Sequence, residues 1–256
     1  MGLNVGGGGD LTAIMVGTIP VKDVYVGDDH VWPTGPVAPP ERVRGYVFSG
    51  GAANVLPPHN PGDMIVVIAS SSSQTGAPLT PTAEGDVPPW TTVGNWYEDG
   101  FMGMTIGYTI ATTSTHMSGY WEGSMVGYIF VTEGQAADPI GDVQVTLVDN
   151  WTRASLPITC PAVTLQDTSG NSELVHFVFG FAGVSGPGAG WLEGTYPPAG
   201  YVGQDYATEF DSGAAYSRCF LTKEDTTSDG EVVVGDVRTG STITSWGSGS
   251  IEIKFA

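Results

Sequence analysis

Residues 102–110 of this 256-residue chain, MGMTIGYTI, indicate the fold class, because apolar side chains occupy every second position from Met102 to Ile110. Successive side chains of a β-strand point to opposite faces of a sheet, so this alternation predicts a half-buried antiparallel strand. The same period of two recurs in residues 143–147 (VQVTL) and in residues 251–255 (IEIKF). No stretch shows the apolar stripe of an amphipathic helix. The sequence therefore predicts an all-β protein.

Two other apolar runs are continuous: MIVVIA at 64–69 and LVHFVF at 174–179. A strand that is apolar at every position is typical of a strand covered on both faces, so we expect a loop, the N-terminal arm or another subunit to cover each one. The two halves of the chain also resemble each other, because each run precedes a further strand region and then a tryptophan, Trp121 or Trp246. With turn clusters about every ten residues, we predict a jelly-roll-like antiparallel β-sandwich of two similar halves.

The chain divides into three parts by composition. Residues 1–32 form a short N-terminal β segment, residues 33–41 (PTGPVAPPE) a stiff proline-rich spacer, and residues 42–256 the β-sandwich domain. One or two short hairpins are marginally stable in water by themselves. We therefore expect the N-terminal segment to dock on another molecule.

The charge balance excludes several partners. Eight Lys and Arg residues against 27 Asp and Glu residues give a net charge of −19, and the basic residues are scattered from Lys22 to Lys254. Binding to nucleic acid requires clustered basic side chains, and anionic membranes attract the same clusters, so neither partner is expected. The N-terminus lacks the pattern of a secretion signal, and no apolar run has the length of a membrane span, so we expect no membrane insertion.

Several short motifs are similar to those of minor tail proteins from phages that infect actinobacteria. The opening pattern is Val21-x-x-Val24-Tyr25-Val26-Gly27 followed by Val31-Trp32-Pro33. The later motifs are Pro61-Gly62-Asp63, Pro88-Pro89-Trp90-Thr91, Ala111 at the end of a long strand, Trp121, Gly190-Trp191 and Ser245-Trp246.

The resemblance implies a virion structural protein at the tail tip or tail fibre, assembled in the host cytoplasm. Its N-terminal segment would dock on other virion tail proteins, with the contact residues Val24, Tyr25, Val31 and Trp32. The sandwich would pack against copies of itself, so a homo-oligomer is expected. The family is not defined by catalytic residues, so the resemblance implies no enzyme.

Aromatic residues in segments rich in Pro and Gly suggest a second function, a carbohydrate-binding module that recognises a glycan of the host cell wall. Exposed rings stack on sugar faces or anchor protein interfaces. The candidate contact residues are Trp96, Tyr97, Tyr196 and Tyr201, whereas Trp90 and Trp191 are expected to plug the two ends of the sandwich.

Carboxylates beside aromatic residues, as a glycoside hydrolase requires, occur at Glu98-Asp99, Glu122 and Glu193. With 27 acidic residues such neighbours arise by chance, so we interpret them as solvated turn or rim positions and expect no catalysis.

No metal or cofactor is expected. Residues 167–173 and 224–231 contain oxygen ligands of the kind that Ca²⁺ prefers, but they also fit ordinary hairpin turns. The four histidines lack ligand spacing, and His176 is interpreted as a hydrogen-bonded core or interface residue. Cys160 and Cys219 are expected to be free, buried thiols.

Overall fold

The computed structural model covers the whole chain, which divides into two compact units, Met1–Glu41 and Arg42–Ala256. The structure describes residues 15–16, 19–20, 24–26, 29–32, 43–49, 56–71, 76–98, 102–124, 126–149, 157–183, 192–193, 202–211, 214–223, 232–237 and 243–256. Within these ranges the secondary structure consists of strands without a helix, and every pairing is antiparallel, so the all-β prediction is confirmed.

The N-terminal unit contains two short strand pairs. Strand β1 (Met15–Val16) pairs with β2 (Ile19–Pro20), and β3 (Val24–Val26) pairs with β4 (Asp29–Trp32). The expected docking residues Val24, Tyr25, Val31 and Trp32 therefore lie in the second pair, but their side chains and the spacer at 33–41 fall outside the described part. Their contact role remains a prediction.

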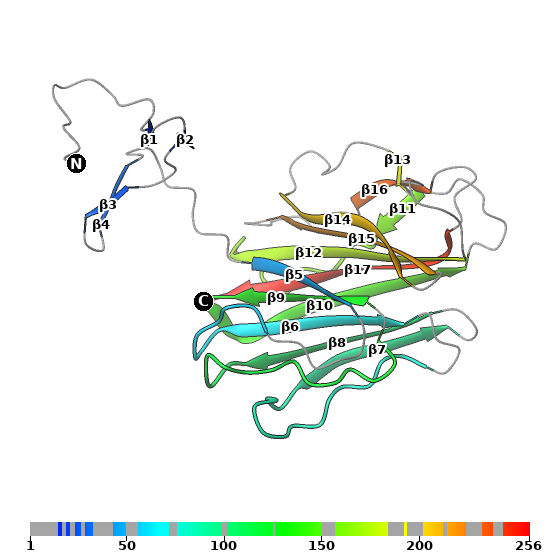
Figure 1. Cartoon of the computed structure of the whole chain (residues 1–256), viewed down its shortest axis with the longest axis horizontal. Helices are drawn as coiled ribbons and strands as arrows, with labels where there is room; N and C mark the ends of the chain where they lie inside the picture. The colour runs from blue at the N-terminus through cyan, green and yellow to red at the C-terminus, as the bar shows by residue number, and fades with distance from the viewer. Residues whose placement is uncertain are drawn as a thin grey trace. The chain divides into compact units, whose positions relative to one another are not determined.

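The first sheet of the larger unit has five strands in the order β5-β9-β6-β8-β7 (Figure 1). Its strands are β5 (Val43–Ser49), β6 (Met64–Ser71), β7 (Thr91–Glu98), β8 (Met102–Ile110) and β9 (Val126–Thr132).

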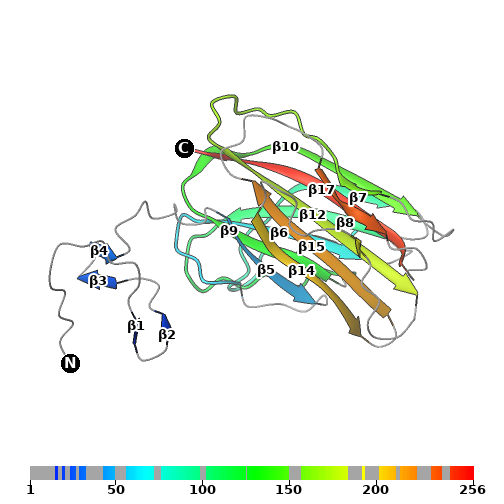
Figure 2. The same cartoon turned by 90° about the horizontal axis from the view of Figure 1, so that it is seen from above.

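The second sheet also has five strands, in the order β10-β17-β12-β15-β14. Its strands are β10 (Gln135–Asp149), β12 (Ser172–Gly183), β14 (Val202–Asp211), β15 (Ala214–Lys223) and β17 (Ile243–Phe255). A small third sheet contains β11 (Pro157–Cys160), β16 (Val232–Val237) and β13 (Leu192–Glu193). Figure 2 shows strands of the second sheet in front of those of the first.

Each large sheet is built from one continuous half of the chain. Numbering the sheet strands of each half from one to five gives the same spatial order, 1-5-2-4-3, in both sheets. The similarity of the two halves in the sequence is thus matched in the topology, since β6 and β12 occupy equivalent positions, as do β9 and β17. The chain crosses from the first large sheet to the second at the Glu133-Gly134 turn. In a jelly roll, Greek-key connections instead carry successive strands back and forth between the two sheets, so the predicted jelly-roll form is not confirmed.

The main core lies between the two sheets and explains the alternating patterns. Met102, Met104 and Ile106 of β8 point into it, and Ile251, Ile253 and Phe255 of β17 meet them from the opposite sheet. Aromatic rings fill the centre, with the ring centroids of Tyr128 and Phe179 4.9 Å apart.

Both faces of β6 are buried, as the continuous run predicts. Met64, Val66 and Ile68 enter the main core, whereas Ile65, Val67 and Ala69 join a second cluster on the outer face of the first sheet. That cluster includes Ala111 and Trp121, so residues of the same chain, within the 111–124 segment, cover the strand. The coil segments 76–90 and 111–124 lie on the lower side of the first sheet in Figure 1.

Strand β12 is buried in the same way. Val175, Phe177 and Phe179 face the main core, and His176 is fully buried with its Nδ1 2.8 Å from Ser250 Oγ. The interpretation of His176 as a hydrogen-bonded core residue is confirmed. Cys160 is buried and forms no disulfide, as expected, whereas the side chain of Cys219 is not described.

Glu252 of β17 differs from the half-buried pattern that its sequence position suggests. Its side chain is 0% exposed, because the segment at 164–167 crosses this face of the sheet. The carboxylate accepts hydrogen bonds from the backbone N–H groups of Gln166 (2.8 Å), Asp167 (2.9 Å) and Asp142 (3.3 Å). These donors replace water, which allows a charged side chain to be buried without a basic partner among these contacts.

Candidate functional site

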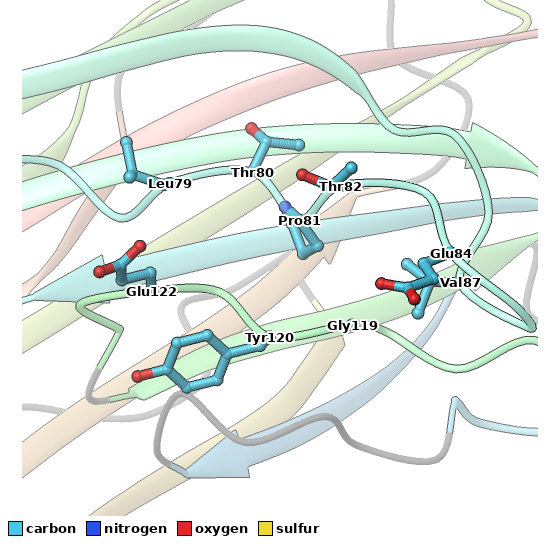
Figure 3. Close-up of a pocket in the computed structure, with 9 residues that line it drawn as sticks. All are labelled: Leu79, Thr80, Pro81, Thr82, Glu84, Val87, Gly119, Tyr120 and Glu122. Atoms are coloured by element: carbon cyan, nitrogen blue, oxygen red, sulfur yellow. The ribbon is translucent and has the colours of Figure 1, made fainter.

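A groove on the outside of the first sheet is a candidate site in the described part of the chain. Its volume is about 460 Å³, within the range of small-ligand sites. One wall comes from the segment after β6: Leu79, Thr80, Pro81, Thr82, Glu84 and Val87. The other comes from the segment between β8 and β9: Gly119, Tyr120 and Glu122. Figure 3 shows Leu79 and Glu122 toward one end and Glu84 toward the other.

The two walls are held together by backbone contacts. The N–H of Leu79 donates to the carbonyl of Glu122 at 2.9 Å, and the N–H of Met117 donates to the carbonyl of Asp86 at 3.0 Å. Gly119 has φ +76°, and a Cβ there would lie 2.6 Å from the Cβ of Pro81. Only glycine adopts this positive φ without strain and also leaves room for the Pro81 side chain, so Gly119 permits the close approach of the two walls.

Two tryptophans support the groove from below. Trp121 is fully buried, and Trp90 packs edge-on against it with ring centroids 5.3 Å apart. Both indole N–H groups donate to the carbonyl of Ser118, at 3.1 Å from Trp90 and 3.2 Å from Trp121. Trp90 thus packs on the outer face of the first sheet, and its expected role as a plug at one end of the sandwich is wrong. Trp191 lies outside the described residues.

Two glycines of strand β8, Gly103 and Gly107, leave room for the segments that pack on the outer face of the sheet. A Cβ at Gly107 would lie 2.9 Å from the ring of Trp121, and a Cβ at Gly103 would lie 2.6 Å from the Cα of Ala77. The two glycines of MGMTIGYTI therefore let the covering segments lie directly on the sheet.

Buried His116 fixes the far end of both segments. Its Nε2 accepts a hydrogen bond from the N–H of Thr112 at 3.1 Å, so the ring proton is on Nδ1, which donates to the carbonyl of Asp86 at 3.1 Å. Its ring stacks on that of His59 with centroids 6.0 Å apart. These contacts, together with the two tryptophans, make the groove a preformed site.

The groove combines exposed apolar surface with negative charge. Tyr120 is 58% exposed and Leu79 is 61% exposed, high values among the large apolar side chains that the structure describes. Glu84 and Glu122 are also exposed, and within the described ranges neither carboxylate forms an ion pair or a side-chain hydrogen bond. No Lys or Arg occurs anywhere in residues 45–152, so the segments that build the groove supply no counter-charge.

The predicted contact residues Trp96 and Tyr97 lie on β7, at the edge of the first sheet, and not in the groove. Trp96 is partly buried against the main core, with its ring over Gly94. Tyr97 is 40% exposed, and as the next residue of a strand it points to the opposite face. The two rings therefore do not form one platform, and the other two candidates, Tyr196 and Tyr201, fall outside the described residues.

Two of the four candidate carboxylates are described, and they lie on different segments, Glu98 on β7 and Glu122 between β8 and β9. Glu122 lines the groove and Glu98 ends β7, whereas the side chains of Asp99 and Glu193 are not described. In the stretch 167–173, Asp167 accepts hydrogen bonds from the backbone N–H and the hydroxyl of Ser169, as a local turn does. These two bonds hold the pKa of Asp167 below its ordinary value. Across the described ranges no three His, Cys, Asp or Glu residues gather as a metal site, and no helix has the length and hydropathy of a membrane span.

Comparisons with family models, with curated proteins and with solved structures find no match to this chain. The site is therefore interpreted from its own geometry.

Sequence reasoning considered Glu122 but missed Leu79, Pro81 and Tyr120. The signals were the turn-rich stretch LTPTAEGDVPP at 79–89 and the long interval without basic residues. Neither signal shows that the two segments meet, because they come together through tertiary packing on β8.

Proposed function

We propose that this protein is a structural component of a phage tail, which attaches to the particle through its N-terminal unit and carries the sandwich as its projecting body. It would be located in the virion tail after assembly in the host cytoplasm. Its partners would be other tail proteins and further copies of this chain.

The division of the chain at Glu41 carries the proposal. The described core residues of the sandwich all lie between Val43 and Phe255, so the larger unit has a core of its own. In the described part of the smaller unit the strands are two to four residues long, and short strand pairs of this kind are marginally stable in water by themselves. A partner that buries these strands would supply the missing stabilisation.

The test is to locate the protein on purified phage particles. Antibody raised against the sandwich, with gold labelling and electron microscopy, is expected to mark the tail. Light scattering of the purified chain is expected to show a homo-oligomer. Particles that lack the protein by mass spectrometry would contradict the proposal.

A second candidate is a carbohydrate-binding module for a glycan of the host surface, and the groove between the segments 79–87 and 119–122 is the observation that favours it. An exposed tyrosine ring beside hydroxyl and carboxylate groups is suited to the apolar face and the hydroxyls of a sugar. Retention of the protein on host cell-wall polysaccharide, with loss in Tyr120→Ala, is the expected result. Unchanged retention would exclude this site.

A further inference from the structure

We infer that the groove binds a saccharide that carries a protonated amine. This inference rests on the second candidate function and names the chemical class of its ligand. It goes further because the charges of the groove, and not only its shape, distinguish between ligands.

The first step is the pair of carboxylates. Glu84 and Glu122 lie toward opposite ends of the groove in Figure 3, and both line it. The 108 residues from 45 to 152 contain no Lys or Arg, and the chain as a whole has a net charge of −19. A cation that approaches the groove is therefore attracted by the two carboxylates and by the whole molecule.

The second step is the apolar surface that lines the groove together with these charges. The ring of Tyr120 and the side chains of Leu79 and Pro81 offer a surface for the C–H face of a sugar ring. A tyrosine ring also attracts a cation placed over its face. An ammonium group on a sugar would gain both this contact and a charge-assisted hydrogen bond to a carboxylate.

The third step separates this ligand from a neutral sugar and from a basic peptide. A neutral hydroxyl exchanges a hydrogen bond with water for one with the protein and leaves the carboxylates without a counter-charge. The side-chain hydroxyls of Thr80 and Thr82 supply additional partners for sugar hydroxyls. A volume of about 460 Å³ between walls that are bonded to each other fits one or two sugar rings better than an extended peptide.

The test is calorimetric titration of the full chain with a short glucosamine oligosaccharide and with its N-acetylated counterpart, which has the same rings without the charge. We expect binding of the glucosamine oligomer, at least tenfold weaker binding of the acetylated one, and weaker binding at higher salt. Glu122→Gln is expected to weaken binding of the charged oligomer about threefold, and the double variant with Glu84→Gln about tenfold. Tyr120→Ala is expected to weaken binding of both oligomers.

Glu98→Gln is the matched control, because Glu98 is exposed on β7 outside the groove, and it is expected to leave binding unchanged. Equal affinity for both oligomers, unaffected by the glutamate substitutions, would overturn the amine inference and leave saccharide binding standing. No affinity for either oligomer or for cell-wall polysaccharide would overturn both. Equal binding of oligolysine that persists in Tyr120→Ala would show general charge attraction and would also overturn the inference.

Discussion

Replacing Glu252 with glutamine tests how the second sheet holds its covering segment. The carboxylate is completely buried and accepts three backbone N–H groups, from Asp142, Gln166 and Asp167. In Glu252→Gln one oxygen becomes an NH₂ group, which cannot accept a hydrogen bond, so at least one buried N–H loses its partner. An unpaired buried donor costs about 1–3 kcal/mol, and the remaining bonds lose their charge assistance. Relief from burying a charge offsets part of this loss.

We therefore expect Glu252→Gln to lower the free energy of unfolding by about 2–3 kcal/mol. For a unit of this size that is a fall in Tm of roughly 4–12 °C. Urea denaturation followed by tryptophan fluorescence measures the difference, with Glu98→Gln as a control expected to change stability by less than about 0.5 kcal/mol. Hydrogen exchange at the amides of Gln166 and Asp167 should accelerate. If Glu252→Gln is as stable as Glu98→Gln and its amide hydrogen exchange is unchanged, Glu252 does not hold the covering segment as described.

Three further substitutions test other parts of the structure. Gly119 has a positive φ, and a Cβ there would collide with Pro81. We therefore expect Gly119→Ala to lower the stability measured by urea denaturation by about 1–3 kcal/mol and to abolish saccharide binding. Stability equal to that of the wild type would refute this prediction. Gly103→Ala should cost about 1–3 kcal/mol through the clash with the backbone of Ala77, and an unchanged denaturation midpoint would contradict it. Partial burial raises the pKa of Asp142, but hydrogen bonds from Thr164 and two other groups outweigh it and hold the pKa below its ordinary value of 3.8. The stabilisation by ionised Asp142 is therefore present above pH 3.8 and is lost as the pH falls through the lower pKa of the folded state. We expect Asp142→Asn to be less stable than wild type at neutral pH and to lose less stability on acidification, as measured by denaturation at a series of pH values. Parallel stability curves for variant and wild type would contradict this prediction.

The sheet strands could be predicted from the sequence because their pattern is local. The continuous run in β6 follows from the burial of both its faces, and the structure confirms it. The alternation in β8 correctly predicted a strand, but not a half-buried one, because Thr105 and Thr109 on its other face are buried as well. The similarity of the two halves was also visible in the sequence, and it agrees with the structure, in which equivalent strands occupy equivalent places in their sheets. The order of the strands in each sheet could not be predicted from the sequence, because β5 pairs with β9 and β10 pairs with β17 through contacts between residues that are far apart in the chain.

The burial of Glu252, the packing of Trp96 and the formation of the groove could not be predicted, because each depends on contacts between distant segments. Glu252 reads as a solvent-facing residue of an alternating strand, and only the N–H groups of a distant segment make its burial favourable. Trp96 reads as an exposed aromatic residue, but its ring packs against the core over Gly94. Tyr120 follows a glycine in a coil segment, and its exposure depends on how the neighbouring Trp121 is anchored at Ser118.

Incorporation of a chain that lacks residues 1–41 into phage particles tests the proposed function most directly. The sandwich has its own core in residues 42–256, so the truncated chain should keep the near-ultraviolet circular dichroism of that unit. We predict that this folded chain, supplied in a host in place of the full protein, is absent from purified particles. Truncated chain incorporated at the level of the full protein would contradict attachment through the N-terminal unit.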